Sequence, residues 1–353
     1  MPIHDYISKS RNAEPFTRDE IVNMLAYPEN SPEAFTLMGE ARRVSEEVTD
    51  GFAEVHGQFA LDLAPCTKNC EWCSFAAKNG VFKEKWQIGV EEAVDCALKF
   101  EREGANAVLT MTTADYPVEK MLEIAQEIRK NIKPDIPLVA NTGDKTLAEA
   151  KKMRESGYDG VYHALRLDEG KRNSISPEKR LESIKNLQDA GLWICTCVEP
   201  IGPEHKNEEL ADLILLTASM NPAFSGAARR IPVPNTALAE YGMVSELRMA
   251  QVVAVTRLAM PRSTRGNCTH EPCTLGALGG ATLFWAEVGA NPRDDQENTE
   301  EHRGKDVDIC KQLYQEAGWD VLEGVSKHFT QAPKPGALSS NFLCRHHLSS
   351  KIF

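Results

Sequence analysis

Residues 59–73 read FALDLAPCTKNCEWC, an apolar run followed at once by three cysteines. The run has the length and composition of a buried β-strand. Cys66, Cys70 and Cys73 then follow with the spacing C-x3-C-x2-C, and Trp72 precedes the last of them. Three thiolates on one short loop can bind three irons of a [4Fe–4S] cluster and leave the fourth iron open to an external ligand. The stretch therefore predicts a cluster site at the end of a strand.

A zinc site is the alternative interpretation of the three cysteines. A structural zinc ion takes four ligands, so a fourth side chain is needed near the loop. His56, shortly before the predicted strand, is the candidate for that role.

Outward from this loop, short apolar runs alternate with amphipathic stretches along the chain. Strands that are regularly separated by helices form parallel βα units. About six to eight such units fit a closed barrel better than an open sheet, so the sequence predicts an α/β fold with a TIM-type (β/α)8 barrel. The further strands are expected at 107–111, 137–142, 160–165, 192–198, 229–233 and 282–288, with a weak run near 259–265, and the helices at 90–103, 118–132, 145–156, 177–190, 207–219, 244–259 and 306–317.

Three regions are expected along the chain. Residues 1–55 are predicted to form an N-terminal helical extension, and residues 56–325 the barrel. Residues 326–353, rich in Pro, Gly and Ser, are predicted to form a C-terminal tail. In that tail, Cys344 and the histidine pair at 346–347 are a further candidate metal group. Because chemistry in TIM-type barrels occurs at the C-terminal ends of the strands, the cysteine loop lies where an active site is expected.

Composition limits the classes of function that fit the chain. The 353 residues include 40 Lys and Arg against 52 Asp and Glu, a net charge of −12, which argues against a nucleic-acid partner. No apolar run is long enough for a membrane span, and the first residues do not resemble a secretory signal, so a cytoplasmic protein without a membrane partner is expected. Ten cysteines in such a chain favour metal or redox chemistry over a disulfide framework.

The cysteine loop at the end of the first strand resembles that of the radical S-adenosylmethionine (SAM) superfamily. The stretches 165–169, 176–184 and 190–195 are similar to the biotin synthase branch, which includes hydrogenase maturases, methylornithine synthase and the two-protein lipoyl synthases. The resemblance implies a radical SAM barrel in which the three cysteines are the catalytic ligands of a [4Fe–4S] cluster. The open iron of that cluster would bind SAM, the second cofactor.

The same resemblance implies which side chains contact SAM. Arg166 and Asp168, after the fourth strand, and Arg180, in the next helix, match contact positions of the relatives. A guanidinium can pair with the methionyl carboxylate of SAM, and a carboxylate can accept a hydrogen bond from a ribose hydroxyl. The alternative interpretation of Arg180 alone is a solvated helix residue. Further contacts with SAM are expected from Trp72, Thr112 and Ile201.

A second set of cysteines predicts an auxiliary iron–sulfur cluster inside the barrel. Cys268 and Cys273 form a C-x4-C loop that contains His270, and Cys195 or Cys197 from an earlier strand can complete the ligands. In biotin synthase, a cysteine that matches Cys195 binds the auxiliary cluster. The alternative is that these cysteines are small buried hydrophobic residues.

The chain also departs from biotin synthase. The two other auxiliary cysteines of that enzyme would align near Thr110 and Ala140, where this sequence has no cysteine. This departure disfavours biotin as the product and points toward lipoyl synthase-like chemistry.

Three functions fit these observations. The favoured prediction is sulfur insertion into C–H bonds, with the auxiliary cluster as the sulfur source. The second is a rearrangement, C–C cleavage or cofactor-building reaction of the hydrogenase-maturase or methylornithine-synthase type, which needs a single cluster. The third, an iron–sulfur carrier, is opposed by the arginines matched to SAM. The resemblance implies a small-molecule or carrier-bound substrate and flavodoxin or ferredoxin as the electron donor.

Overall fold

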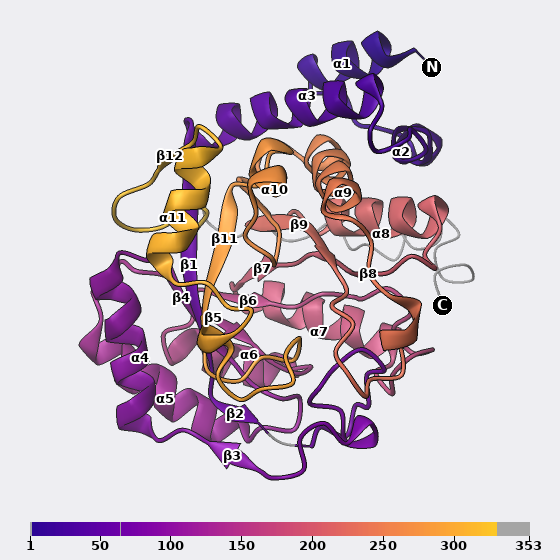
Figure 1. Cartoon of the computed structure of the whole chain (residues 1–353). Coiled ribbons are helices and arrows are strands. Elements are labelled where there is room, and N and C mark those ends of the chain that lie inside the picture. The colour runs from indigo at the N-terminus through magenta and orange to yellow at the C-terminus, as the bar shows by residue number, and fades with distance from the viewer. Residues whose placement is uncertain (1, 64, 330–353) are drawn as a thin grey trace.

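A computed structural model of the chain describes residues 2–63 and 65–329, and parallel strands form a closed barrel at its centre (Figure 1). The sheet closes because β10 pairs with both β9 and β11, and β11 pairs with β1. β7 and β8 share one position beside β9, so the barrel has eight strand positions. The predicted TIM-type fold is therefore confirmed. The barrel strands are β1 (Phe52–Ala60), β4 (Ala107–Met111), β5 (Leu138–Asn141), β6 (Gly160–Tyr162), β7 (Trp193–Cys195), β8 (Val198–Ile201), β9 (Phe224–Arg229), β10 (Gly266–Cys268) and β11 (Leu283–Val288).

Helices cover the outside of the barrel (Figure 1). The main hydrophobic core packs these helices against the strands, and a second, smaller core fills the barrel interior. Seven of these helices agree with the predicted ones to within a few residues, and the short α10 is additional. The helices are α4 (Val90–Glu103), α5 (Val118–Asn131), α6 (Leu147–Glu155), α7 (Pro177–Asp189), α8 (Asn207–Ser219), α9 (Glu246–Ala259), α10 (Thr274–Leu278) and α11 (Val307–Glu316).

Several strands differ from the prediction. β1 begins at Phe52 and ends at Ala60, and the run 192–198 is divided between β7 and β8. β9 and β10 are also displaced. β9 lies before the expected run 229–233 and consists mainly of small residues, and β10 follows the weak run near 259–265. The small residues are explained by a close approach between the two strands. A Cβ atom at Gly226 in β9 would lie 2.0 Å from the carbonyl oxygen of Cys268 in β10, so glycine is required there.

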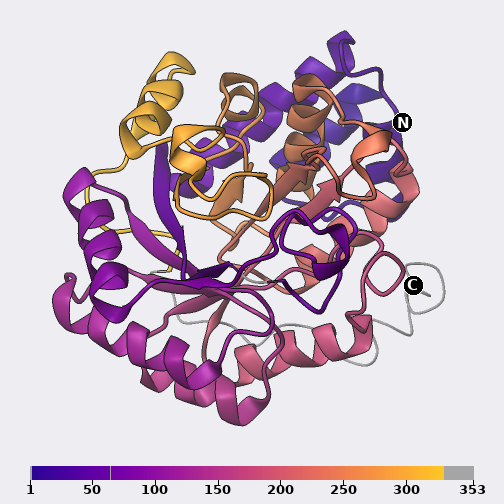
Figure 2. The ribbon, with the colours of Figure 1, turned by 60° about the horizontal axis from the view of Figure 1, so that its bottom comes forward.

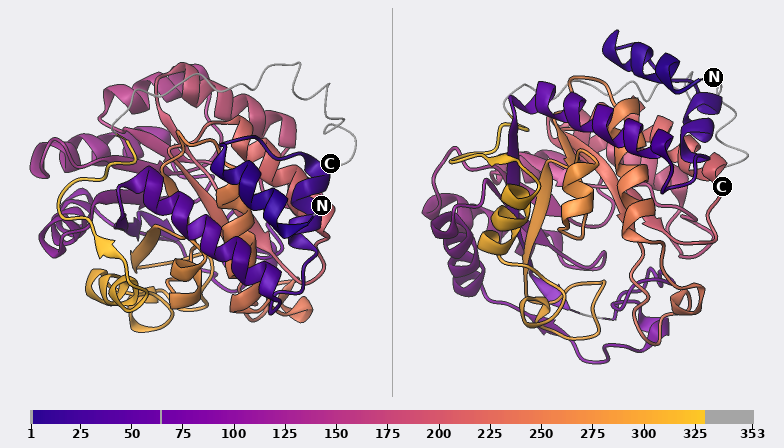
Figure 3. Two further views of the ribbon diagram at one scale, coloured as in Figure 1. Left: turned by 90° about the horizontal axis from the view of Figure 1, so that it is seen from above. Right: turned by 45° about the horizontal axis from the view of Figure 1, so that its top comes forward.

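The N-terminal region is helical, as expected, and comprises α1 (Ile3–Arg11), α2 (Arg18–Leu25) and α3 (Pro32–Thr49). α3 packs against α9 and α10 and crosses one end of the barrel (Figure 3). The Ser45 hydroxyl in α3 donates a hydrogen bond of 2.6 Å to the Gly280 carbonyl. β1 begins at Phe52, within the region predicted as the extension.

The chain returns to the barrel after α11. β12 (Asp320–Val321) pairs with the start of β1, and residues 322–329, here called the plug segment, cross the N-terminal end of the barrel. The Ser326 amide donates to the Asn106 carbonyl (2.8 Å), and a Cβ atom at Gly266 would lie 2.8 Å from the His328 ring. The predicted tail thus starts with packed residues.

The candidate metal group at Cys344 and 346–347 lies outside the described residues. None of the helices in the described ranges is long and apolar enough to cross a membrane.

Candidate functional site

The cysteine loop lies at the C-terminal face of the barrel, next to the small antiparallel pair β2 (Asp62–Leu63) and β3 (Trp86–Gln87) (Figure 2). Backbone hydrogen bonds fix the loop: the Cys66 amide donates to the Phe75 carbonyl at 2.7 Å. The Asn79 side chain donates to the carbonyls of Cys70 (3.1 Å) and Cys73 (2.8 Å). All three cysteines line one cavity that opens to solvent. The predicted ligands are therefore brought together.

The surroundings of the three sulfurs fit a bound cluster. Burial raises the pKa of Cys70 to about 11 and also raises the pKa of Cys66 and Cys73. Thiolates are thus unfavourable at this site unless a cation compensates their charge, and metal binding does so. Three cysteines held on one loop offer the thiolates that a cluster with one open iron needs.

The zinc alternative is not supported by the position of His56. Its Nε2 lies 2.9 Å from Glu54 Oε2 at the opposite end of the barrel, where its ring packs against Trp285 and Phe224. His56 is therefore not a fourth ligand of the cysteine loop.

Four of the six residues expected to contact SAM line the cavity: Trp72, Thr112, Arg166 and Arg180. Both guanidinium groups are held by carboxylates, since Arg166 Nε lies 2.9 Å from Glu199 Oε1 and Arg180 Nε lies 2.7 Å from Asp144 Oδ1. Arg180 is only 4% exposed, which rules out the solvated-residue interpretation.

The other two residues expected to contact SAM, Asp168 and Ile201, are not among the described residues that line the cavity. Asp168 forms an ion pair of 3.4 Å with His205, and its backbone is left-handed with φ 59°. Ile201 is buried in β8. Their contact with SAM remains a prediction.

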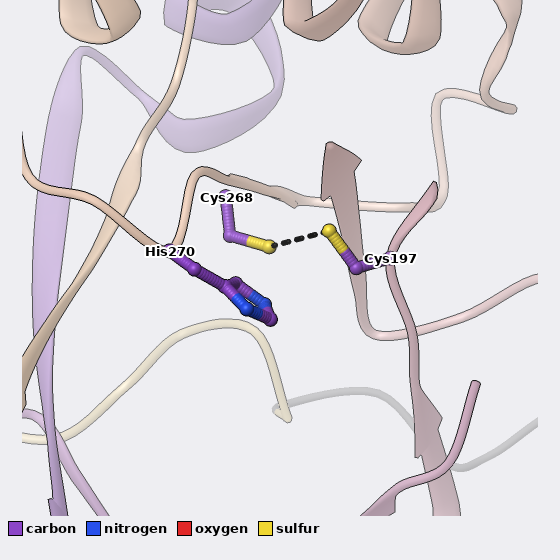
Figure 4. Close-up of side chains that lie close together, drawn as sticks. All are labelled: Cys197, Cys268 and His270. Carbon is purple, nitrogen blue, oxygen red and sulfur yellow. Dashed lines mark hydrogen bonds between the residues drawn. The ribbon is translucent and has the colours of Figure 1, made fainter. Parts of the chain in front are cut away.

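A second group lies deeper in the barrel and consists of Cys197, Cys268 and His270, here called the inner group (Figure 4). The two sulfurs are 3.8 Å apart, and the three ligand atoms all lie within 4.8 Å of one another. Cys197 reaches this place because the strand is interrupted between β7 and β8, and Cys268 is the last residue of β10. His270 also lines the cavity, so the inner group borders the cysteine-loop site.

Two cysteines that the sequence placed among the ligands are not in the inner group. Cys195 is buried in the interior core two residues earlier, and Cys273 is the N-cap of α10, where its sulfur accepts a hydrogen bond from the Gly276 amide at 3.3 Å. The structure thus associates Cys268 with Cys197 rather than with Cys195 or Cys273.

The electrostatics of the inner group favour a thiolate at Cys268. Burial opposes its ionisation, but hydrogen bonds with Cys197 and His270 lower the pKa of Cys268 to about 6. Burial raises the pKa of Cys197 well above its usual value. Ionisation is therefore easier for Cys268 than for Cys197.

Glu199 was missed as a site residue, although it directly precedes the loop that contains Ile201. One carboxylate oxygen pairs with Arg166 at 2.9 Å and the other lies 3.3 Å from His270 Nδ1. The Tyr162 hydroxyl lies 3.1 Å from the other ring nitrogen of His270. Glu199 therefore connects the predicted SAM side of the cavity with the inner group.

Glu287 is a second residue that was not among the predicted site residues. It is 2% exposed and pairs with Arg293 and with Arg303, the latter at 2.8 Å. Burial opposes its charge, but the two guanidinium groups lower the pKa of Glu287 to about 2. The carboxylate thus fixes Arg293, which lines the cavity, and also holds Arg303.

Comparisons with known proteins agree with this arrangement. Residues 65–217 match the model of the radical SAM superfamily. The chain is 27% identical over 259 residues to biotin synthase of Anaplasma marginale (strain Florida), which covers 67% of this chain and 79% of the relative. It is 25% identical over 281 residues to biotin synthase 1 of Corynebacterium diphtheriae, which covers 76% of this chain and 77% of the relative.

Solved structures show the same fold. Methylornithine synthase superposes with a TM-score of 0.75 at 16% identity, over 90% of this chain and 97% of that one. The FeFe-hydrogenase maturase HydG from Carboxydothermus hydrogenoformans superposes with a TM-score of 0.70 at 20% identity, over 89% of this chain and 78% of that one.

The barrel and its cysteine loop thus define a radical SAM enzyme. Within that superfamily, the chain is similar in sequence to biotin synthases. Membership implies a [4Fe–4S] cluster and SAM as cofactors, and the residues of the cavity fit both.

Proposed function

We propose that this radical SAM enzyme inserts sulfur into an unactivated C–H bond and that the inner group binds an auxiliary iron–sulfur cluster. The observation that supports the proposal is the gathering of two cysteines and a histidine inside the barrel, beside the cavity that the cysteine loop lines. A cluster at this place would border the substrate space. The substrate is a small molecule or a carrier-bound group, and the electron donor is a flavodoxin or ferredoxin.

The geometry of the inner group fits iron ligands. Two thiolates on one tetrahedral metal with bonds of about 2.3 Å are separated by roughly 3.8 Å. The sulfurs of Cys197 and Cys268 have this separation. Histidine joins cysteine as a ligand in some iron–sulfur clusters. Cys197, Cys268 and His270 would therefore hold the auxiliary cluster as its ligands.

The side chains of the cavity have separate tasks. When bound, SAM and the first cluster supply a 5′-deoxyadenosyl radical, and the auxiliary cluster supplies sulfide. Arg166 and Arg180 bind and orient the methionyl carboxylate, and Glu199 fixes the fork of Arg166. Trp285 and Tyr162 line the inner wall and exclude water from the reacting space.

One observation favours the single-cluster alternative, a rearrangement or cofactor-building enzyme. The inner group has three ligand atoms within reach of one metal, and Cys195 and Cys273 lie elsewhere. A mononuclear ion or a simple thiol pair would satisfy the same residues. Sulfide content separates these cases, because only a cluster contains inorganic sulfide.

The test is anaerobic iron and sulfide quantitation with Mössbauer spectra after reconstitution. The proposal expects about six to eight irons per wild-type chain with matching sulfide, against about four for a single [4Fe–4S] cluster. The double variant Cys197→Ala/Cys268→Ala should retain about four irons. Cys273→Ala is the matched control, because Cys273 lies in the same loop outside the inner group, and it should keep the wild-type content.

Two results would contradict the proposal. Wild-type protein with about four irons indicates a single cluster and a reaction without sulfur transfer. Iron in excess of sulfide by about one atom per chain indicates a mononuclear site at the inner group.

A further inference from the structure

Three buried side chains meet at the N-terminal end of the barrel, opposite the catalytic face. Glu54 and His56 come from β1 and His328 from the plug segment, and together they are here called the base group. Their ligand atoms all lie within 4.8 Å of one another, and each residue is at most 3% exposed. His56 Nε2 is 2.9 Å and His328 Nδ1 is 3.4 Å from Glu54 Oε2.

The imidazoles of the base group lack the partners that buried polar atoms normally have. Within the described residues, neither ring nitrogen of His328 makes a hydrogen bond, and the same holds for His56 Nδ1. Buried nitrogens without partners lose their hydrogen bonds to water and gain none in return, so they destabilise the folded chain. His328 is also confined, because a Cβ atom at Gly266 would collide with its ring. Such a ring, aimed at a carboxylate and another imidazole, indicates a missing ligand.

The donor set and spacing suit a zinc ion. Two histidines and one carboxylate are common zinc ligands, and tetrahedral bonds of about 2.0–2.1 Å separate neighbouring ligand atoms by roughly 3.3 Å. The observed separations lie on either side of that value. Glu54 is oriented by the Lys327 amide at 2.8 Å and by the Ser326 hydroxyl, as outer-shell donors orient metal-binding carboxylates.

We propose that Glu54, His56 and His328 bind one Zn²⁺ that joins the plug segment to the first strand of the barrel. The role is structural, because none of the three residues lines the cavity of the cysteine loop. A water molecule would complete the four ligands. The positive charges of Arg257 and Arg265, which act on His328, oppose a dication at this place, and the three ligands must outweigh them.

The site is tested by metal analysis of the holoenzyme purified from zinc-supplemented cells. Elemental analysis should find about one zinc per chain in addition to iron, and the zinc X-ray absorption spectrum should show nitrogen and oxygen neighbours only, at about 2.0–2.1 Å. The sulfur-free shell distinguishes this site from zinc bound at the cysteines. His328→Gln should lose the zinc and keep the iron, whereas His302→Gln, at an exposed position, should keep both.

The wild-type measurement decides the proposal even if His328→Gln does not fold. Wild-type protein without zinc, or with zinc that has sulfur neighbours, overturns the site. Because iron and sulfide are measured in the same samples, failure of this proposal is distinguishable from failure of the proposed sulfur chemistry.

Discussion

The inner group and the base group are two sets of side chains in one barrel that could each hold a metal ion, and they differ in their ligand atoms. The inner group is rich in sulfur, borders the open cavity and connects to Arg166 through Glu199. The base group offers nitrogen and oxygen and is sealed by the plug segment. The comparison teaches that the C-terminal end of this barrel is arranged for reaction and the N-terminal end for stability, in line with the general division in TIM-type barrels.

The largest expected effect comes from removing a ligand at the reactive end. Cys70→Ala should lower 5′-deoxyadenosine formation by at least about 10³-fold, because an essential group supplies much of an enzyme's acceleration. The release of 5′-deoxyadenosine is measured by chromatography with SAM and dithionite. Zinc at the base group should be unchanged. Loss of both together would show that the two ends are not independent.

The next effect separates the inner group from the cysteine loop. Cys268→Ala should lower sulfur incorporation by about 100-fold or more and leave SAM cleavage within about threefold of wild type, because the ligands of the first cluster are intact. Both quantities are read by mass spectrometry in one assay, with Cys273→Ala as the control. Equal loss of cleavage and incorporation would place Cys268 in the first cluster's machinery instead.

The third prediction concerns the stability that the Glu287 carboxylate contributes at the C-terminal end of the barrel. The pKa of Glu287 falls from 4.5 to about 2 in the folded chain, so its stabilisation is full above pH 4.5 and is lost as the pH falls toward 2. The shift corresponds to about 3 kcal/mol of unfolding free energy. Anaerobic urea unfolding between pH 6 and pH 3 should show the larger part of this loss in wild type. Glu287→Gln should have a lower stability at pH 6 and a flatter pH dependence, and an unchanged slope would contradict the assignment.

The smallest effect concerns Glu199, which connects the predicted SAM side of the cavity with the inner group. Glu199→Gln removes the charge that holds Arg166 and His270, and it should reduce kcat/KM for SAM by about 10-fold, the lower range for partners of ligands. Steady-state kinetics over a range of SAM concentrations measure the change. Glu204→Gln, whose carboxylate pairs with Arg230 instead, should leave that value unchanged. An equal decrease of kcat/KM in both variants would contradict a specific role of Glu199 in holding Arg166.

Much of the fold could be predicted because helices α4 to α9 and most strands have clear periodicity. Gly104, Gly157 and Gly191 also mark the ends of α4, α6 and α7. β9 could not, because the close contact with β10 at Gly226 selects small residues in place of an apolar run. At the site, the cysteine loop could be recognised because its three cysteines are close together in the sequence. The choice of Cys197 over Cys195 depends on the interruption between β7 and β8, which no residue pattern marks. His56 and His328 meet only through the plug segment, far along the chain.

The contact at Gly226 has an evolutionary consequence. Any side chain at this position would push β10 outward and move Cys268 away from Cys197, although position 226 is not itself a ligand. A lineage could therefore abandon the inner group through a single codon change and keep every cysteine. Genomic surveys that count only cysteine and histidine codons would still score such a descendant as having the group.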